Sequence, residues 1–204
     1  GIQLTMNGGL GNDLFVGSEG NDLINGGDGD DTALMGAGDD TFVWNPGDDN
    51  DTLEGQDGFD TMLFNGANVA EQVDVSANGD RLTFFRNPGT VTMDTAGVER
   101  VDFKALGGTD LVTVNDLTAT DVNELVLDLA ATLGGGTGDG QADRVVVNAT
   151  DGNDAIDVSG DAGEVKVNGL APTIRLLHSE AASDRLEIDT RAGTDTVDTT
   201  GLAA

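Results

Sequence analysis

A nine-residue pattern repeats six times between Gly8 and Leu63, and it constrains the fold more than any other feature of the chain. The sixth position of every copy is aspartate, the eighth is apolar, and the first four positions are rich in glycine. The copies begin at Gly8, Gly17, Gly26, Met35, Pro46 and Gly55, with Trp44 and Asn45 inserted between the fourth and fifth. A short period that repeats in phase is typical of a solenoid, in which each repeat contacts only its neighbours.

Each copy predicts a glycine-rich turn of six residues followed by a strand of three. Glycine adopts positive φ without a Cβ clash, so such a turn can bend sharply and aim its carbonyl groups inward. The middle residue of each strand occupies the eighth position, and alternation along a strand points it into the core. The residues at the eighth position are Phe15, Ile24, Ala33, Phe42, Leu53 and Met62.

The charge of the chain favours a divalent cation as partner. There are 38 acidic and 9 basic residues, for a formal net charge of −29, and no Lys or Arg precedes Arg81. A solvated or disordered acidic tail is the simpler alternative, but the acids are phased with apolar residues rather than scattered. Nucleic-acid binding is disfavoured, because phosphate recognition uses Lys and Arg. Calcium prefers about six to eight oxygen ligands, which carboxylates and turn carbonyls provide.

Residues 1–65 resemble the RTX (hemolysin-type) family, whose repeat G-G-x-G-x-D-x-U-x binds calcium in a β-roll. The resemblance implies an all-β, right-handed parallel β-roll or β-helix solenoid, with two nonapeptides in each coil and each ion between turns on the same edge. It pairs Asp13 with Asp31, Asp22 with Asp40, Asp31 with Asp51, and Asp40 with Asp60. The expected calcium-binding residues are Asp13, Asp22, Asp31, Asp40, Asp51 and Asp60, with the turn residues Gly9, Gly11, Gly20, Gly27, Gly29, Gly36, Gly38, Asp49 and Gly58.

Residues 66–204 show a second, looser pattern. Three G-x-D elements end at Asp110, Asp154 and Asp195, and apolar residues at alternating positions flank each of them. These features predict β-turn-β units with further short strands between them. The candidate strands are Val73–Val75, Leu82–Phe85, Val91–Met93, Val126–Leu129, Val165–Val167 and Ile174–Leu177. We therefore expect two regions: a calcium-binding roll over residues 1–65, continued over 66–204 by a wider, irregular β-solenoid or sandwich.

Several motifs leave two interpretations open. The dipeptides Glu99-Arg100, Asp143-Arg144 and Asp184-Arg185 predict an ion-pair ladder between coils rather than a surface for acidic glycans. The segment Gly134–Asp143 is a flexible loop or a weaker calcium site formed by Asp139 and Asp143. Trp44 is interpreted as a packing plug at the insertion, with sugar stacking as the less favoured alternative.

Catalysis finds little support in the sequence. The only histidine, His178, ends an apolar run and is expected at the surface, so we expect no enzyme activity. Cysteine is absent, which excludes disulfides and thiolate metal sites, and no apolar run approaches the ~20 residues of a membrane span.

The sequence thus predicts a structural or assembly module that folds on binding several calcium ions within a larger secreted or cell-surface protein. The alternative is an adhesin-type region that binds a glycan or surface and is stiffened by the roll. Neither end shows a polar cap, so end-to-end association or contact with neighbouring repeats is expected. The family resemblance implies export by a type I secretion-like route.

Overall fold

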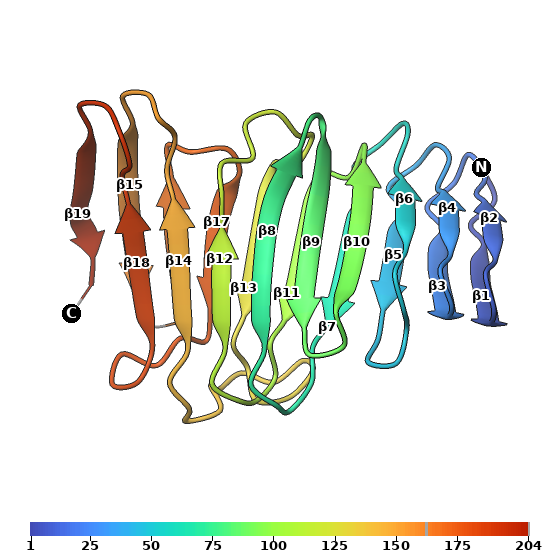
Figure 1. The fold of residues 1–204 in the computed structure, drawn as a ribbon, viewed down its shortest axis with the longest axis horizontal. Coiled ribbons are helices and arrows are strands. Elements are labelled where there is room, and N and C mark those ends of the chain that lie inside the picture. The colour runs from blue at the N-terminus through green and yellow to red at the C-terminus, as the bar shows by residue number, and fades with distance from the viewer. Residues whose placement is uncertain (162, 204) are drawn as a thin grey trace.

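The computed structural model describes residues 1–161 and 163–203, and these residues form β-strands and no helix (Figure 1). The strands are β1 (Thr5–Leu10), β2 (Leu14–Val16), β3 (Leu23–Asp28), β4 (Thr32–Leu34), β5 (Thr41–Trp44), β6 (Thr52–Glu54), β7 (Thr61–Asn65), β8 (Gln72–Asn78), β9 (Arg81–Asn87), β10 (Val91–Ala96), β11 (Arg100–Lys104), β12 (Leu111–Val114), β13 (Glu124–Asp128), β14 (Arg144–Asn148), β15 (Ala155–Asp161), β16 (Glu164–Asn168), β17 (Thr173–Leu177), β18 (Arg185–Asp189) and β19 (Thr196–Leu202). Within the described part of the chain, no helix that could cross a membrane is present.

The strands form two long sheets, between which the chain winds as a solenoid. Sheet A has ten strands in the order β1-β3-β5-β7-β11-β13-β17-β16-β15-β19, and sheet B has nine in the order β18-β14-β12-β8-β9-β10-β6-β4-β2. Figure 1 shows the N-terminal strands at one end of the molecule and β19 at the other. Most neighbouring strands are parallel, which confirms the predicted all-β solenoid.

The repeat register is the predicted one, with two nonapeptides in each coil. Successive repeats place their strands alternately in sheet B and sheet A, so each repeat pairs with the next but one along the chain. Phe15 lies opposite Ala33, and Ile24 lies opposite Phe42. After the Trp44-Asn45 insertion the pairing continues, with Phe42 opposite Met62.

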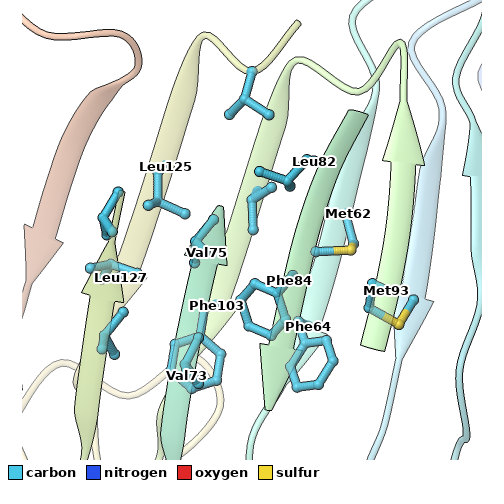
Figure 2. Close-up of a cluster of buried hydrophobic side chains, with 14 of the residues drawn as sticks. Met62, Phe64, Val73, Val75, Leu82, Phe84, Met93, Phe103, Leu125 and Leu127 are labelled. Carbon is cyan, nitrogen blue, oxygen red and sulfur yellow. The ribbon is translucent and has the colours of Figure 1, made fainter. Parts of the chain in front are cut away.

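The core is a narrow column of side chains between the sheets. All six eighth-position residues are buried, as the alternation predicts. The column contains an aromatic cluster in which Trp44 stacks on Phe64 with ring centroids 4.0 Å apart. Phe84 and Phe103 extend this cluster, and Figure 2 shows Phe64, Phe84 and Phe103 packed with Met62 and Met93. Trp44 is fully buried, which confirms its interpretation as a packing plug and leaves no ring face for a sugar.

Two antiparallel insertions make residues 66–204 irregular. In sheet B, β9 runs antiparallel to both β8 and β10. In sheet A, β16 runs antiparallel to both β15 and β17. Elsewhere in this region the parallel winding continues, because β12 pairs with β14 and β11 pairs with β13.

The three G-x-D elements are turns between strands, as predicted, but they do not lie in one column. Asp110 leads into β12 in sheet B, whereas Asp154 and Asp195 lead into β15 and β19 in sheet A. The apolar spacing is the same for a turn at either edge, so the sequence pattern could not separate them. The acids stacked with Asp110 are instead Asp143 and Asp184, each of which precedes a sheet B strand.

Candidate metal centre

The sixth-position aspartates line the two edges of the roll. The Asp13 edge consists of the turns that enter sheet B, where Asp13, Asp31 and Asp51 directly precede β2, β4 and β6. The Asp22 edge consists of the turns that enter sheet A, where Asp22, Asp40 and Asp60 directly precede β3, β5 and β7.

Hydrogen bonds connect these aspartates in the four pairs that the family resemblance implies. On the Asp13 edge, the backbone N–H of Asp13 donates to Oδ1 of Asp31 at 2.7 Å, and that of Asp31 donates to Oδ1 of Asp51 at 2.9 Å. On the Asp22 edge, the N–H of Asp22 donates to Asp40 at 2.6 Å, and that of Asp40 donates to Asp60 at 2.8 Å. The carboxylates of Asp31, Asp40, Asp51 and Asp60 are therefore each held at one oxygen by the preceding coil.

The second oxygen of most of these carboxylates is buried without a hydrogen bond. Within residues 1–161 and 163–203, the Oδ2 atoms with no hydrogen-bond partner are those of Asp13, Asp31, Asp40, Asp51 and Asp60. Four of these side chains are almost fully buried, with Asp51 3% exposed and Asp60 fully enclosed. Leaving a buried polar oxygen unsatisfied costs about 1–3 kcal/mol, and more when it is charged. The same set of atoms is suited to bind a cation, which removes that cost.

Asp22 is the exception among the six. Its Oδ2 accepts a 2.7 Å hydrogen bond from the N–H of Ser18, four residues earlier in the same turn. Its Oδ1 accepts from the N–H of Leu4, which occupies the place of an aspartate in the preceding coil. The Asp22 carboxylate is thus satisfied by protein groups, and the sequence pattern alone did not separate it from its five neighbours.

The predicted turn residues differ in backbone conformation. Seven of the nine predicted turn residues have positive φ: Gly9, Gly11, Gly27, Gly29, Gly36, Gly38 and Gly58. Gly20, in the Ser18 turn, and Asp49, in the insertion-disturbed turn, do not belong to this group. At the first position, a Cβ on Gly26 would lie 2.2 Å from Oδ2 of Asp31, so glycine leaves the room that the carboxylate occupies.

Electrostatics opposes the ionised carboxylates at both edges. Burial raises the pKa of Asp51 and of Asp60 to about 7, and repulsion from Asp31 and Asp40 respectively adds to the effect. Burial likewise raises the pKa of Asp31 and Asp40 above the ordinary aspartate value. A nearby divalent cation reverses this balance, because it favours the charged form.

A second ladder at the fifth position was missed by the sequence analysis. Its side chains accept hydrogen bonds from backbone N–H groups of the following coil, opposite in direction to the sixth-position ladder. The donor-acceptor pairs are Asp30 to Asn12, Asp39 to Asn21, Asn50 to Asp30, Phe59 to Asp39 and Thr92 to Asn50. The sequence contains a pattern that could have predicted this ladder, since five of the six copies have Asn or Asp at the fifth position.

Beyond the roll, arginine side chains form ion pairs with several acidic side chains. Glu71 precedes β8 on the Asp13 edge, and its buried carboxylate forms an ion pair with Arg86 of β9. The Arg86 guanidinium also lies 5.3 Å from the centroid of the Trp44 ring. On the outer faces, Arg100 pairs with Glu124 of the next coil and Arg144 pairs with Glu187. The predicted ion-pair ladder is therefore confirmed for these two arginines, whereas Arg185 pairs with Glu187 on its own strand.

The remaining candidate, His178, lies just after β17 and is half-buried. Its Nδ1 is 2.7 Å from Oδ1 of Asp128, whose other oxygen pairs with Lys104. This arrangement connects β17 to β13 and accounts for the histidine structurally.

The donor set at the edges of the roll fits calcium. Among residues 1–161 and 163–203, no cluster of three or more His, Cys, Asp or Glu side chains could hold a metal. Each candidate site therefore offers two stacked carboxylates, and the rest of the shell has to come from turn carbonyls and water. Such an all-oxygen shell is the one that calcium prefers.

Comparison with known proteins identifies the repeats. The family of RTX calcium-binding nonapeptide repeats matches residues 7–42 and 46–63 in four copies. No curated protein sequence matches the chain. Among solved structures, the extracellular lipase LipA from Serratia marcescens is similar with 12% identity and a TM-score of 0.38, over 84% of this chain and 38% of the lipase chain.

Proposed function

We propose that residues 7–63, which are RTX calcium-binding nonapeptide repeats, fold as a calcium-binding β-roll only when calcium is bound. The observation that carries the proposal is the set of five buried Oδ2 atoms without a hydrogen bond, on Asp13, Asp31, Asp40, Asp51 and Asp60. No Lys or Arg precedes Arg81, and the ion pairs of the described residues include none of these five aspartates.

The ions would bind between stacked turns. Asp13 with Asp31 and Asp31 with Asp51 would hold ions on the Asp13 edge, and Asp40 with Asp60 would hold one on the Asp22 edge. The Asp22–Asp40 pair is the weakest candidate, because Ser18 already satisfies the Asp22 carboxylate. Calcium supplies two positive charges there, while the chain orients the carboxylates through the sixth-position ladder.

At the level of the whole protein, we propose a structural module of a larger exported protein that acts outside the cell or at its surface. Extracellular calcium modules bind with dissociation constants of about 10⁻⁴–10⁻³ M, so a roll of this affinity stays unfolded where calcium is scarce. Among the described aromatic side chains only Phe59 is largely exposed, so the structure does not favour the glycan-binding alternative.

Calorimetric titration of the full chain with calcium tests the proposal. We expect several ions to bind, and Asp40→Asn to lower both the number of ions and the heat of folding. Asp154→Asn is the matched control, since Thr150 satisfies the Asp154 carboxylate outside the repeats. Absence of calcium binding to the wild-type chain, or equal stoichiometry in Asp40→Asn, would contradict it.

A further inference from the structure

The Asp13 edge continues beyond the matched repeats. Asp110, Asp143 and Asp184 directly precede the sheet B strands β12, β14 and β18, as Asp13, Asp31 and Asp51 precede theirs. The sixth-position hydrogen-bond ladder continues too. The N–H of Glu71 donates to Oδ1 of Asp110 at 2.8 Å, that of Asp110 to Asp143 at 2.8 Å, and that of Asp143 to Asp184 at 3.2 Å.

The turns of this protein fall into two classes, according to whether the second carboxylate oxygen accepts a hydrogen bond. In one class, a backbone N–H four residues earlier donates to Oδ2: Ser18 to Asp22, Thr150 to Asp154 and Glu180 to Asp184. In the other class this donor is missing, as for the five roll aspartates whose Oδ2 has no partner.

Asp110 belongs to the second class. It is 3% exposed and accepts one hydrogen bond, at Oδ1, while its Oδ2 accepts none from the described residues. The residue four positions earlier is Leu106, whose positive φ of 69° matches the glycines at the second position of the roll turns. Asp110 is thus a buried side chain with one oxygen that accepts no hydrogen bond from the described residues and can bind a ligand. Unlike the five Oδ2 atoms of the roll, this oxygen is not fully enclosed by the protein.

The charges that surround Asp110 and Asp143 are negative. Burial raises the pKa of Asp110 to about 7, and repulsion from Asp143, Glu71 and Asp139 contributes. Burial raises the pKa of Asp143 to about 6, again with acids as the neighbouring charges. On the same edge, Arg86 pairs with Glu71, but no base pairs with Asp110 or Asp143 among the described residues.

We propose that Asp110 and Asp143 bind a divalent cation, with calcium the best chemical match, between the turns 105–110 and 138–143. Two carboxylates and the carbonyls of two glycine-containing turns offer a hard cation an all-oxygen shell. Asp139 has a positioning role: its Oδ2 accepts the N–H of Gly108 at 2.8 Å and its Oδ1 accepts that of Gln141, so it joins the two turns. The site lies outside the residues that match the repeat family.

Counting the ions bound to the full chain tests this site, with calcium alone as the probe. Asp110→Asn keeps an oxygen to accept the Glu71 N–H but loses the charge, so native mass spectrometry should find one ion fewer than in the wild type. Asp184→Asn is the matched control in the same ladder, and it should bind the wild-type number of ions. Equal ion numbers in Asp110→Asn and the wild type would overturn the proposal.

Hydrogen exchange in the wild-type chain covers the case in which Asp110→Asn does not fold. Residues 105–112 and 138–145 should gain protection when calcium is added. Calcium-dependent protection that is confined to residues 7–63 would overturn the second site while leaving the roll proposal intact. Loss of ions in Asp40→Asn but not in Asp110→Asn would separate the two proposals in the same way.

Discussion

Asp31→Asn should have opposite effects on stability with and without calcium. Asparagine keeps an oxygen for the Asp13 N–H but removes a charge that stands between Asp13 and Asp51. Neighbouring coils are about 4.8 Å apart. Two ionised carboxylates at that distance repel each other by about 3 kcal/mol at an effective dielectric of 20. Solvent at the turn edge screens this to about 1–2 kcal/mol, so the calcium-free variant should be more stable than the wild type by that amount.

With calcium bound, Asp31→Asn should lower the stability of the roll instead of raising it. An ion at 100 times its dissociation constant contributes about 2.7 kcal/mol of stability, and Asp31 adjoins two candidate sites, so the variant should lose about 5 kcal/mol. Urea unfolding, followed by the fluorescence of the fully buried Trp44, measures the free energy of unfolding in millimolar calcium and at a series of lower calcium concentrations at which the roll still folds. Extrapolation of that series to zero calcium gives the calcium-free value. Asp22→Asn is the matched control because it is buried to the same extent and Ser18 satisfies its Oδ2; its effect should stay below about 1.5 kcal/mol. A change of the same sign in both conditions, or an equal effect of Asp22→Asn, would refute the reasoning.

Three further predictions concern pH, packing and association. Asp51 and Asp60 have folded-state pKa values of about 7, above the unfolded value, so their contribution to stability is present at low pH and is lost as pH rises through 7. Far-UV circular dichroism in chelator should therefore show more β-structure at pH 5.5 than at pH 8, and an equal or smaller β-signal at pH 5.5 contradicts this. Trp44→Ala removes the stacking on Phe64 and the contact with Arg86. In calcium the free energy of unfolding, measured with urea, should fall by about 3–5 kcal/mol, and a fall of less than about 1 kcal/mol would contradict this. The sheets end at β1 and β2 on one side and at β18 and β19 on the other, and a cavity of about 450 Å³ adjoins Leu186 and Leu202. Sedimentation of the 204-residue polypeptide in calcium should therefore show end-to-end dimers. A strict monomer at high concentration would contradict this prediction.

The roll could be predicted from sequence because its constraints are local. An aspartate and an apolar residue two positions apart, repeated in phase, fix both the turn and the inward face of each strand. The strands that contain Phe15, Ile24 and Phe42 accordingly lie in the predicted register. The candidate strands of residues 66–204 were also largely found, as β8, β9, β10, β13, β16 and β17 show.

The winding of that second region could not be predicted, because it depends on contacts between distant segments. Leu82 and Phe84 have the same alternation in an antiparallel strand as in a parallel one, so the reversal at β9 left no local signal. The neighbours of Asp60 could not be predicted for a similar reason. The pairing that the resemblance implies gives Asp60 one partner, Asp40, but its N–H also donates to Oε2 of Glu99 at 2.7 Å, from a turn 39 residues away. Asp60 therefore has an acidic neighbour in both adjoining coils, whereas the Oδ2 of Asp22 accepts a hydrogen bond from the N–H of Ser18.

The dependence of folding on calcium is the central claim, and titration of the chelated full chain tests it most directly. Far-UV circular dichroism reports the β-structure, and Trp44 fluorescence reports the roll, because Trp44 is fully buried against Phe64. The account predicts reduced β-signal and solvent-exposed Trp44 emission in chelator, with both restored together as calcium is added. A full β-spectrum and buried Trp44 emission in chelator, unchanged by calcium, would contradict it.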